Sequence, residues 1–261
     1  LYRTHTKAVV KGELKRQELR DYGIIFLNGR KIASLDRRHK QNRVAINITT
    51  VPSVLDILVE TGGRINYGHD INENRKGITQ QVTLDGKELT DWEIFRMPMD
   101  NIADIPFAKS DTIAGPQFRR ATFALETPGD TYLDMRGWGK GCVWINGHNL
   151  GRFWYIGPQQ TLYVPGVCLI AGENEIIILE LEDHGGRTIS GRKEPILDQL
   201  ERDELQPVLP PRMKGRIRLS AGDLVKQGSF APSDSAQDLF FPAIKGRYVC
   251  LRSLSSQKRD P

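Results

Sequence analysis

The chain has 261 residues, of which 39% are hydrophobic and 26% are charged, and its formal net charge is +5. This length predicts two modest domains and part of a third, and no apolar run reaches the roughly 18 to 20 residues of a membrane helix. The basic excess does not indicate a nucleic-acid partner, because no helix-turn-helix, zinc finger or RNA-binding signature accompanies it.

Cysteine and histidine positions do not indicate a metal or redox site. Cys142, Cys168 and Cys250 lie far apart without a CxxC pair, and the five histidines show no ligand spacing. Cys142 and Cys168 fit strand positions, where a thiol behaves as a small hydrophobe. We expect neither cofactor nor metal. Because Leu1 opens directly in a strand pattern, we also expect no signal peptide and a piece of a longer protein.

Residues 1–60 predict five or six strands broken by turns, with Glu13–Arg20 as the only stretch suited to a short helix. The glycine-rich segment Gly62–Gly68 then leaves the sheet. A hairpin with an Asp85-Gly86 turn and a closing strand at Trp92–Phe95 complete this first unit.

A second unit follows the Pro-, Asp- and Gly-rich link Pro98–Pro116. Its centre is Gly137–Trp154, which combines the densest aromatic clustering of the chain with a turn signal. Asn146-Gly147 supplies the two positive-φ residues of a type I′ turn. We therefore predict a β-hairpin here.

The second unit repeats the first. Arg20–Ala33 and Arg136–Gly151 share an Arg-x-aromatic-Gly start, an apolar run and an Asn-Gly pair. The flanking correspondences are Tyr2–Thr6 with Phe118–Thr122, Val44–Ile48 with Thr161–Pro165, and Leu55–Glu60 with Asn174–Glu180. Ordered matches at a nearly constant offset predict two copies of one all-β unit.

A boundary at Asp183–Arg187 precedes a charged, proline-bearing stretch in which Pro195–Leu205 suggests a helical turn or two. A new β pattern begins at Gly215–Leu219. We expect an N-terminally truncated first β-sandwich, a second sandwich, a linker and an incomplete third β segment. Their expected ranges are 1–100, 101–185, 186–214 and 215–261.

The motifs resemble a known family. Gly137–Trp154, Gly157–Pro165 and Asn174–Glu182 are similar to the C-terminal β-domains of bacterial-like glycoside hydrolase family 35 β-galactosidases. The preceding domain of that family resembles Leu1–Thr4, Asp21–Asn28, Leu55–Glu60, Gly63–Gly68 and Arg75–Ile78. The resemblance covers about residues 1–183. It implies tandem jelly-roll, galactose-binding-like sandwiches after a catalytic (β/α)8 barrel. Gln227–Phe230 and Gly246–Leu251 resemble the opening of a discoidin-type carbohydrate-binding module.

No catalytic residue is assigned. Retaining glycosidases need two carboxylates about 5 to 5.5 Å apart, and the resemblance places both on the barrel. A barrel takes roughly 250 residues of alternating strand and helix, a pattern that this sequence lacks. Glu180 and Glu182 share a strand face, but acids at a strand end are mostly solvated.

Four aromatic residues are candidates for sugar contact, since sugar rings stack on aromatic faces: Trp138, Trp144, Trp154 and Tyr155. Aromatic residues more often fill cores and interfaces, so we favour the sandwich core or the seam with the barrel for most of them. Trp138 is the best ligand candidate, because its flanking glycines indicate an exposed turn.

The resemblance thus implies the non-catalytic portion of an enzyme that hydrolyses terminal β-galactosides. The compartment of this chain stays open, and the parent enzyme is expected in the periplasm or outside the cell. The chain would support the barrel and contact a galactoside or galactan. Two alternatives stay open: a stand-alone carbohydrate-binding module, and a β-sandwich protein that only mediates assembly.

Overall fold

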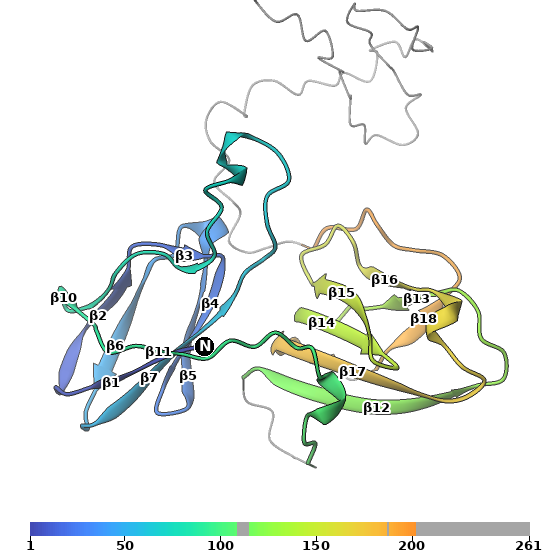
Figure 1. Cartoon of the computed structure of the whole chain (residues 1–261), viewed down its shortest axis with the longest axis horizontal. Coiled ribbons are helices and arrows are strands. Elements are labelled where there is room, and N and C mark those ends of the chain that lie inside the picture. The colour runs from blue at the N-terminus through green and yellow to red at the C-terminus, as the bar shows by residue number, and fades with distance from the viewer. Residues whose placement is uncertain (109–114, 187, 202–261) are drawn as a thin grey trace, which may run out of the picture. The chain divides into compact units, whose positions relative to one another are not determined.

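The computed structural model describes residues 1–108, 115–186 and 188–201. Over these residues the chain is all-β and forms two successive β-sandwiches, as predicted (Figure 1). No helix in this part of the chain is long and apolar enough to cross a membrane. The expected segment 215–261, with Cys250 and the discoidin-like pattern, lies outside the described residues, as does the expected linker from residue 202 onward.

The first sandwich combines a five-stranded sheet, in the order β11-β1-β7-β4-β5, with a four-stranded sheet, β10-β9-β2-β6. A small third sheet joins β3 to β8. The elements are β1 (Tyr2–Thr6), β2 (Val10–Arg16), β3 (Leu19–Arg20), β4 (Tyr22–Leu27), β5 (Arg30–Asp36), η1 (Arg37–His39), β6 (Arg43–Ile48), β7 (Ser53–Glu60), η2 (His69–Ile71), β8 (Gly77–Ile78), β9 (Val82–Leu84), β10 (Lys87–Glu88) and β11 (Glu93–Ile94).

The short helix expected at Glu13–Arg20 is absent, and that expectation is wrong. These residues form the end of β2 and all of β3. Strand β2 is paired on both sides, with β6 and with β9, so its backbone hydrogen bonds are made across the sheet. Cross-strand pairing of this kind outweighs a weak local preference for helix.

The second sandwich combines the sheets β12-β17-β14-β15 and β16-β13-β18. Its last strand, β18, pairs with β13 although it falls within the stretch expected to be linker. The elements that follow the first sandwich are η3 (Ile102–Asp104), β12 (Gln117–Leu125), β13 (Thr131–Asp134), β14 (Lys140–Ile145), β15 (His148–Trp154), β16 (Thr161–Val164), η4 (Gly166–Cys168), β17 (Gly172–Glu182) and β18 (Ser190–Arg192).

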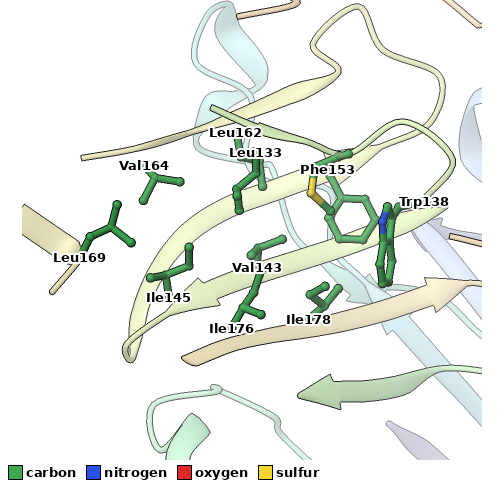
Figure 2. Close-up of a cluster of buried hydrophobic side chains, with 11 residues drawn as sticks. Leu133, Trp138, Val143, Ile145, Phe153, Leu162, Val164, Leu169, Ile176 and Ile178 are labelled. Carbon is green, nitrogen blue, oxygen red and sulfur yellow. The ribbon is translucent and has the colours of Figure 1, made fainter. Parts of the chain in front are cut away.

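Each sandwich has its own apolar core. In the first, Leu55 and Ile57 of β7 are 0% exposed and lie opposite Leu27 and Ile25 of β4. Figure 2 shows the second core, in which side chains of β14, β15 and β17 from one sheet face those of β13 and β16 from the other. Burying one such side chain contributes about 1.5 to 3 kcal/mol.

The topology confirms the predicted repeat. Strands β1, β7, β4 and β5 follow one another in their sheet in the same order as β12, β17, β14 and β15. Both hairpins carry a register shift at the same place, between Ile25 and Phe26 and between Val143 and Trp144. The strand pairing shifts one expected match by a residue. Tyr2 lies opposite Ile57, Arg119 lies opposite Ile178, and Ile57 and Ile178 are equivalent. Tyr2 is therefore equivalent to Arg119, whereas the sequence predicts a match with Phe118.

The Asn-Gly turn of each hairpin also anchors the following long strand. Asn146 and Gly147 have φ angles of 48° and 81°, as the type I′ prediction requires. The Asn146 amide donates to Asn174 Oδ1 at 2.8 Å and accepts from the Glu175 N–H at 2.9 Å. Asn28 makes the equivalent contacts with the first two residues of β7, Ser53 and Val54.

This geometry predicts that Asn146 stabilises the second sandwich by two separable effects. Asn146→Gly keeps the positive φ and removes the side-chain hydrogen bonds, so it should cost about 1 to 3 kcal/mol. Asn146→Ala should cost about 1 kcal/mol more, because alanine is strained in the left-handed region. Urea unfolding measures both, with the exposed Asn47→Ala as control. A glycine variant as stable as the wild type would show that the side-chain bonds contribute nothing.

Candidate functional site

Two glutamates at the ends of the equivalent long strands reach across to the other sandwich. Glu60, the last residue of β7, places Oε2 2.7 Å from Lys140 Nζ and Oε1 3.4 Å from Arg152 Nη1. Lys140 begins β14 and Arg152 lies on β15, so one acid of the first sandwich engages two cations of the second.

Glu182, the last residue of β17, makes the reciprocal contacts. It accepts hydrogen bonds from Tyr22 Oη at 2.7 Å, from Lys31 Nζ at 2.5 Å and from Ser34 Oγ. These three donors lie on β4 and β5 of the first sandwich. We call the two sets of contacts, Glu60 with Lys140 and Arg152 and Glu182 with Tyr22, Lys31 and Ser34, the carboxylate clasp.

The clasp holds both acids ionised. Burial by itself would raise the pKa of Glu60, but the Lys140 ammonium, the Gly62 N–H and the Arg152 guanidinium together outweigh it and lower that pKa below its usual value. Burial likewise opposes ionisation of Glu182, and the hydrogen bonds from Lys31, Ser34 and Tyr22 again lower its pKa. Burial and the adjacent Glu182 charge raise the pKa of Tyr22, so its hydroxyl stays a donor.

Trp154 packs against the carboxylate clasp. Its ring centroid is 3.9 Å from Lys140 Nζ and 4.1 Å from the Arg38 guanidinium carbon. Tyr22 meets the same ring edge-on, with centroids 6.2 Å apart and planes at 78°. Cations over an aromatic face are attracted by its quadrupole. Trp154 therefore belongs to the seam between the two sandwiches.

Glu180 and Glu182 do not form a catalytic pair, and the expectation that both are solvated is wrong. Glu180 is 1% exposed, lies 3.0 Å from Arg119 Nη2 and accepts from the Gly139 N–H at 3.1 Å. The Glu182 side chain is 17% exposed and engages the first sandwich. The fold gives each acid its own cation, which the strand pattern alone does not reveal.

Close backbone packing explains the glycines at positions 139 and 141. A Cβ atom on Gly139 would lie 1.8 Å from the Glu182 carbonyl oxygen, and one on Gly141 would lie 1.7 Å from the Leu179 carbonyl oxygen. Strands β14 and β17 shift register at this place. The glycine pattern therefore serves strand packing.

The glycines flanking Trp138 do not expose it, so that expectation is wrong. The indole is 3% exposed, donates from Nε1 to the Thr188 carbonyl at 3.0 Å and lies 5.2 Å below the Arg119 guanidinium. Gly186 packs against the ring. The loop after β17 covers the indole, a contact across about fifty residues.

The other two aromatic candidates are also engaged. Trp144 is 3% exposed and packs with Ile177 and with Ile102 of the link between the sandwiches, in a cluster that includes Cys142. Burial raises the pKa of the Cys142 thiol. The Tyr155 ring lies 4.2 Å from the His184 ring and keeps partial exposure. Sugar contact by the four aromatic residues stays a prediction.

A cavity of about 680 Å³ lies in the second sandwich beside β12. Its walls are mostly apolar and include Phe123, Leu125, Ile176, Ile178 and Trp138. Figure 2 labels the last three of these side chains. Arg119, Asp130 and Thr131 add polar groups. Sequence reasoning missed this cavity, because its walls come from strands far apart in the chain.

Comparison with known proteins matches both sandwiches. Residues 1–98 match the family model described as the first all-beta domain of beta-galactosidase. Residues 116–174 match the model described as the galactose-binding domain of beta-galactosidase. The chain is 42% identical over 164 residues to a beta-galactosidase of Xanthomonas manihotis, covering 63% of this chain and 27% of that protein.

Two mammalian relatives also carry beta-galactosidase descriptions. Beta-galactosidase-1-like protein 2 of Homo sapiens is 35% identical over 190 residues, covering 69% of this chain and 29% of the relative. The beta-galactosidase of Bos taurus is 37% identical over 186 residues, covering 62% and 28%. The chain therefore spans less than a third of the length of these relatives. With its two sandwiches matching the first all-β domain and the galactose-binding domain, the chain belongs to the β-galactosidase family as a set of its non-catalytic domains.

Proposed function

We propose that this chain supports the catalytic (β/α)8 barrel of a β-galactosidase that hydrolyses terminal β-galactosides. The observation that carries the proposal is the carboxylate clasp. Each sandwich has a separate core. Glu60 of the first sandwich and Glu182 of the second each contact the opposite sandwich, which makes the two sandwiches suited to act as one rigid support.

The protein contacts of Glu180 and Glu182 support a non-catalytic role. A glycosidase nucleophile must approach the anomeric carbon of the sugar, and its partner must reach the leaving oxygen. Glu180 is held inside the second sandwich by Arg119 and Gly139, and Glu182 is held by three donors of the first. Both carboxylates are thus committed to protein contacts.

Within this proposal, sugar contact falls to Trp154 and Tyr155. They keep partial exposure, whereas Trp138 and Trp144 are buried. Both lie where β15 ends, close to the clasp. A galactoside bound by the whole enzyme would reach them at the rim of the support and not in its cores.

The non-catalytic role predicts that the pure chain leaves a chromogenic β-galactoside intact under conditions in which a full-length β-galactosidase, such as that of Xanthomonas manihotis, hydrolyses it. Absorbance of the released phenolate measures the reaction. Hydrolysis by the wild-type chain that disappears in Glu180→Gln or Glu182→Gln would place a catalytic acid here and contradict the proposal.

The clasp predicts strong coupling between Glu60 and Lys140. Lys140→Met leaves a largely buried carboxylate with only the Gly62 N–H and, as its cation, the more distant Arg152, so the free energy of unfolding should fall by about 1 to 3 kcal/mol. Adding Glu60→Gln should restore part of that loss in a double-mutant cycle. The exposed pair Lys7–Asp91, with side chains 83% and 78% exposed, is the control and should show almost no coupling. Equal coupling for both pairs would argue against the clasp.

Stability should also fall in acid. The pKa values of Glu60 and Glu182 are lower in the folded chain than in the unfolded chain. Their contribution is therefore complete above the unfolded value of about 4.3 and is lost as pH falls through the lower folded values. Urea unfolding at a series of pH values measures this loss. The double variant Glu60→Gln, Glu182→Gln should show a shallower acid slope, and an unchanged slope would exclude these two groups as its cause.

A further inference from the structure

The two sandwiches differ at one sheet edge. In the first, β1 pairs with β7 on one side and with β11 on the other, and Leu1 and Phe95 exchange two backbone hydrogen bonds of 2.8 Å. In the second, the equivalent strand β12 pairs with β17 on one side only. Within residues 1–108, 115–186 and 188–201, no strand pairs with its other edge.

This free edge is long and straight. Strand β12 has nine residues, pairs with β17 without a register shift and contains no proline. Its charged residues are Arg119, which pairs with Glu180, and Arg120, which lies 3.8 Å from Glu175 Oε2. Native sheets usually blunt such edges with bulges, proline or charge, because an open edge recruits another strand. Thr122 shows which backbone groups are open. Thr122 lies opposite Glu175 of β17. The backbone N–H and carbonyl of Glu175 hydrogen-bond Asn146 of the β14–β15 turn, on the other side of β17. The backbone N–H and carbonyl of Thr122 therefore point away from β17.

The first sandwich shows what an occupant of this edge looks like. Strand β11 places Glu93 opposite Arg3. The residue before it, Trp92, packs against the first core. Arg3 and Arg120 are equivalent by register, since they lie opposite the equivalent residues Asp56 and Ile177. The second sandwich thus repeats the arginine that faces the acid of β11.

The cavity lies where the equivalent of Trp92 would insert. Inward-facing residues of β12, including Ala121 and Phe123, line it together with β13 and β17. In the first sandwich the corresponding core is packed by a large aromatic side chain from the residue just before the added strand, whereas the second has an apolar hollow of about 680 Å³. Its mostly apolar wall fits a hydrophobic side chain better than a hydroxylated sugar.

We propose that the free edge of β12 binds an extended segment of a partner polypeptide, which adds antiparallel to the sheet as a fifth strand. The segment carries an acidic residue opposite Arg120 and a large apolar residue that enters the cavity beside Ala121. Main-chain hydrogen bonds supply affinity, and these two side chains supply selectivity. This surface is separate from the carboxylate clasp, so the two proposals fail independently.

The probe is a fluorescein-labelled peptide with the sequence of residues 91–97, which contains Trp92, Glu93 and Ile94. Fluorescence anisotropy with the full 261-residue chain should show saturable binding with a Kd of about 1 to 100 μM, the range of modest strand addition. Thr122→Pro removes an outward N–H and should weaken binding about tenfold or more. Thr122→Ala, which keeps that N–H, is the matched control.

A charge exchange tests the register without relying on proline. A peptide with Glu93→Lys should bind the wild-type chain weakly and should recover affinity for the Arg120→Glu chain, because opposite charges again face each other. Ala121→Trp fills the cavity and should abolish binding, whereas Ala124→Trp, on the opposite face of β12, should not. Thermal unfolding of each variant confirms that it folds.

Several results would overturn the proposal. Absence of binding at about 1 mM peptide would remove the docking site. Binding insensitive to Thr122→Pro and to the charge exchange would place the peptide elsewhere. Peptide displacement by free galactose would make the cavity a sugar site. A concentration-dependent dimer that Thr122→Pro abolishes would assign the edge to a second copy of the chain.

Discussion

The ion pair between Glu60 and Lys140 crosses from one sandwich to the other, and the placement of the two sandwiches depends on it and on its reciprocal at Glu182. Among the described residues each sandwich buries its own core, and Tyr22 of the first meets Trp154 of the second across the seam. Charged groups at a seam specify geometry more than they add net stability, because desolvation offsets much of their attraction. Trp154 lies against both Lys140 and Arg38 and adds aromatic surface beside these charges.

The chain uses one structural unit twice and for different purposes. Both copies have the same sheet order, the same register shift and the same Asn-Gly turn tied to the following strand. They diverge at the edge next to the first strand. The first copy covers this edge with β11, and the second leaves β12 open beside a cavity.

The aromatic residues show how a cluster can suggest a ligand site and serve packing. Trp138 closes the second core, Trp144 packs on the link between the sandwiches and Trp154 joins the seam. The sequence places these residues in one hairpin region, but it does not show on which side of the sheet each side chain lies. Successive strand residues point to opposite sides of the sheet, so neighbours in sequence enter different environments.

The sequence by itself determined the all-β class, the two copies and their Asn-Gly turns, because alternating burial and positive φ angles are properties of short segments. The motifs also identified the β-galactosidase domains. Only the tertiary structure decided that Glu13–Arg20 is extended, that Glu180 is buried and that Trp138 is covered. Such outcomes depend on partners far away in the chain: Glu182 accepts its hydrogen bond from Tyr22, 160 residues earlier, and no local pattern encodes that meeting.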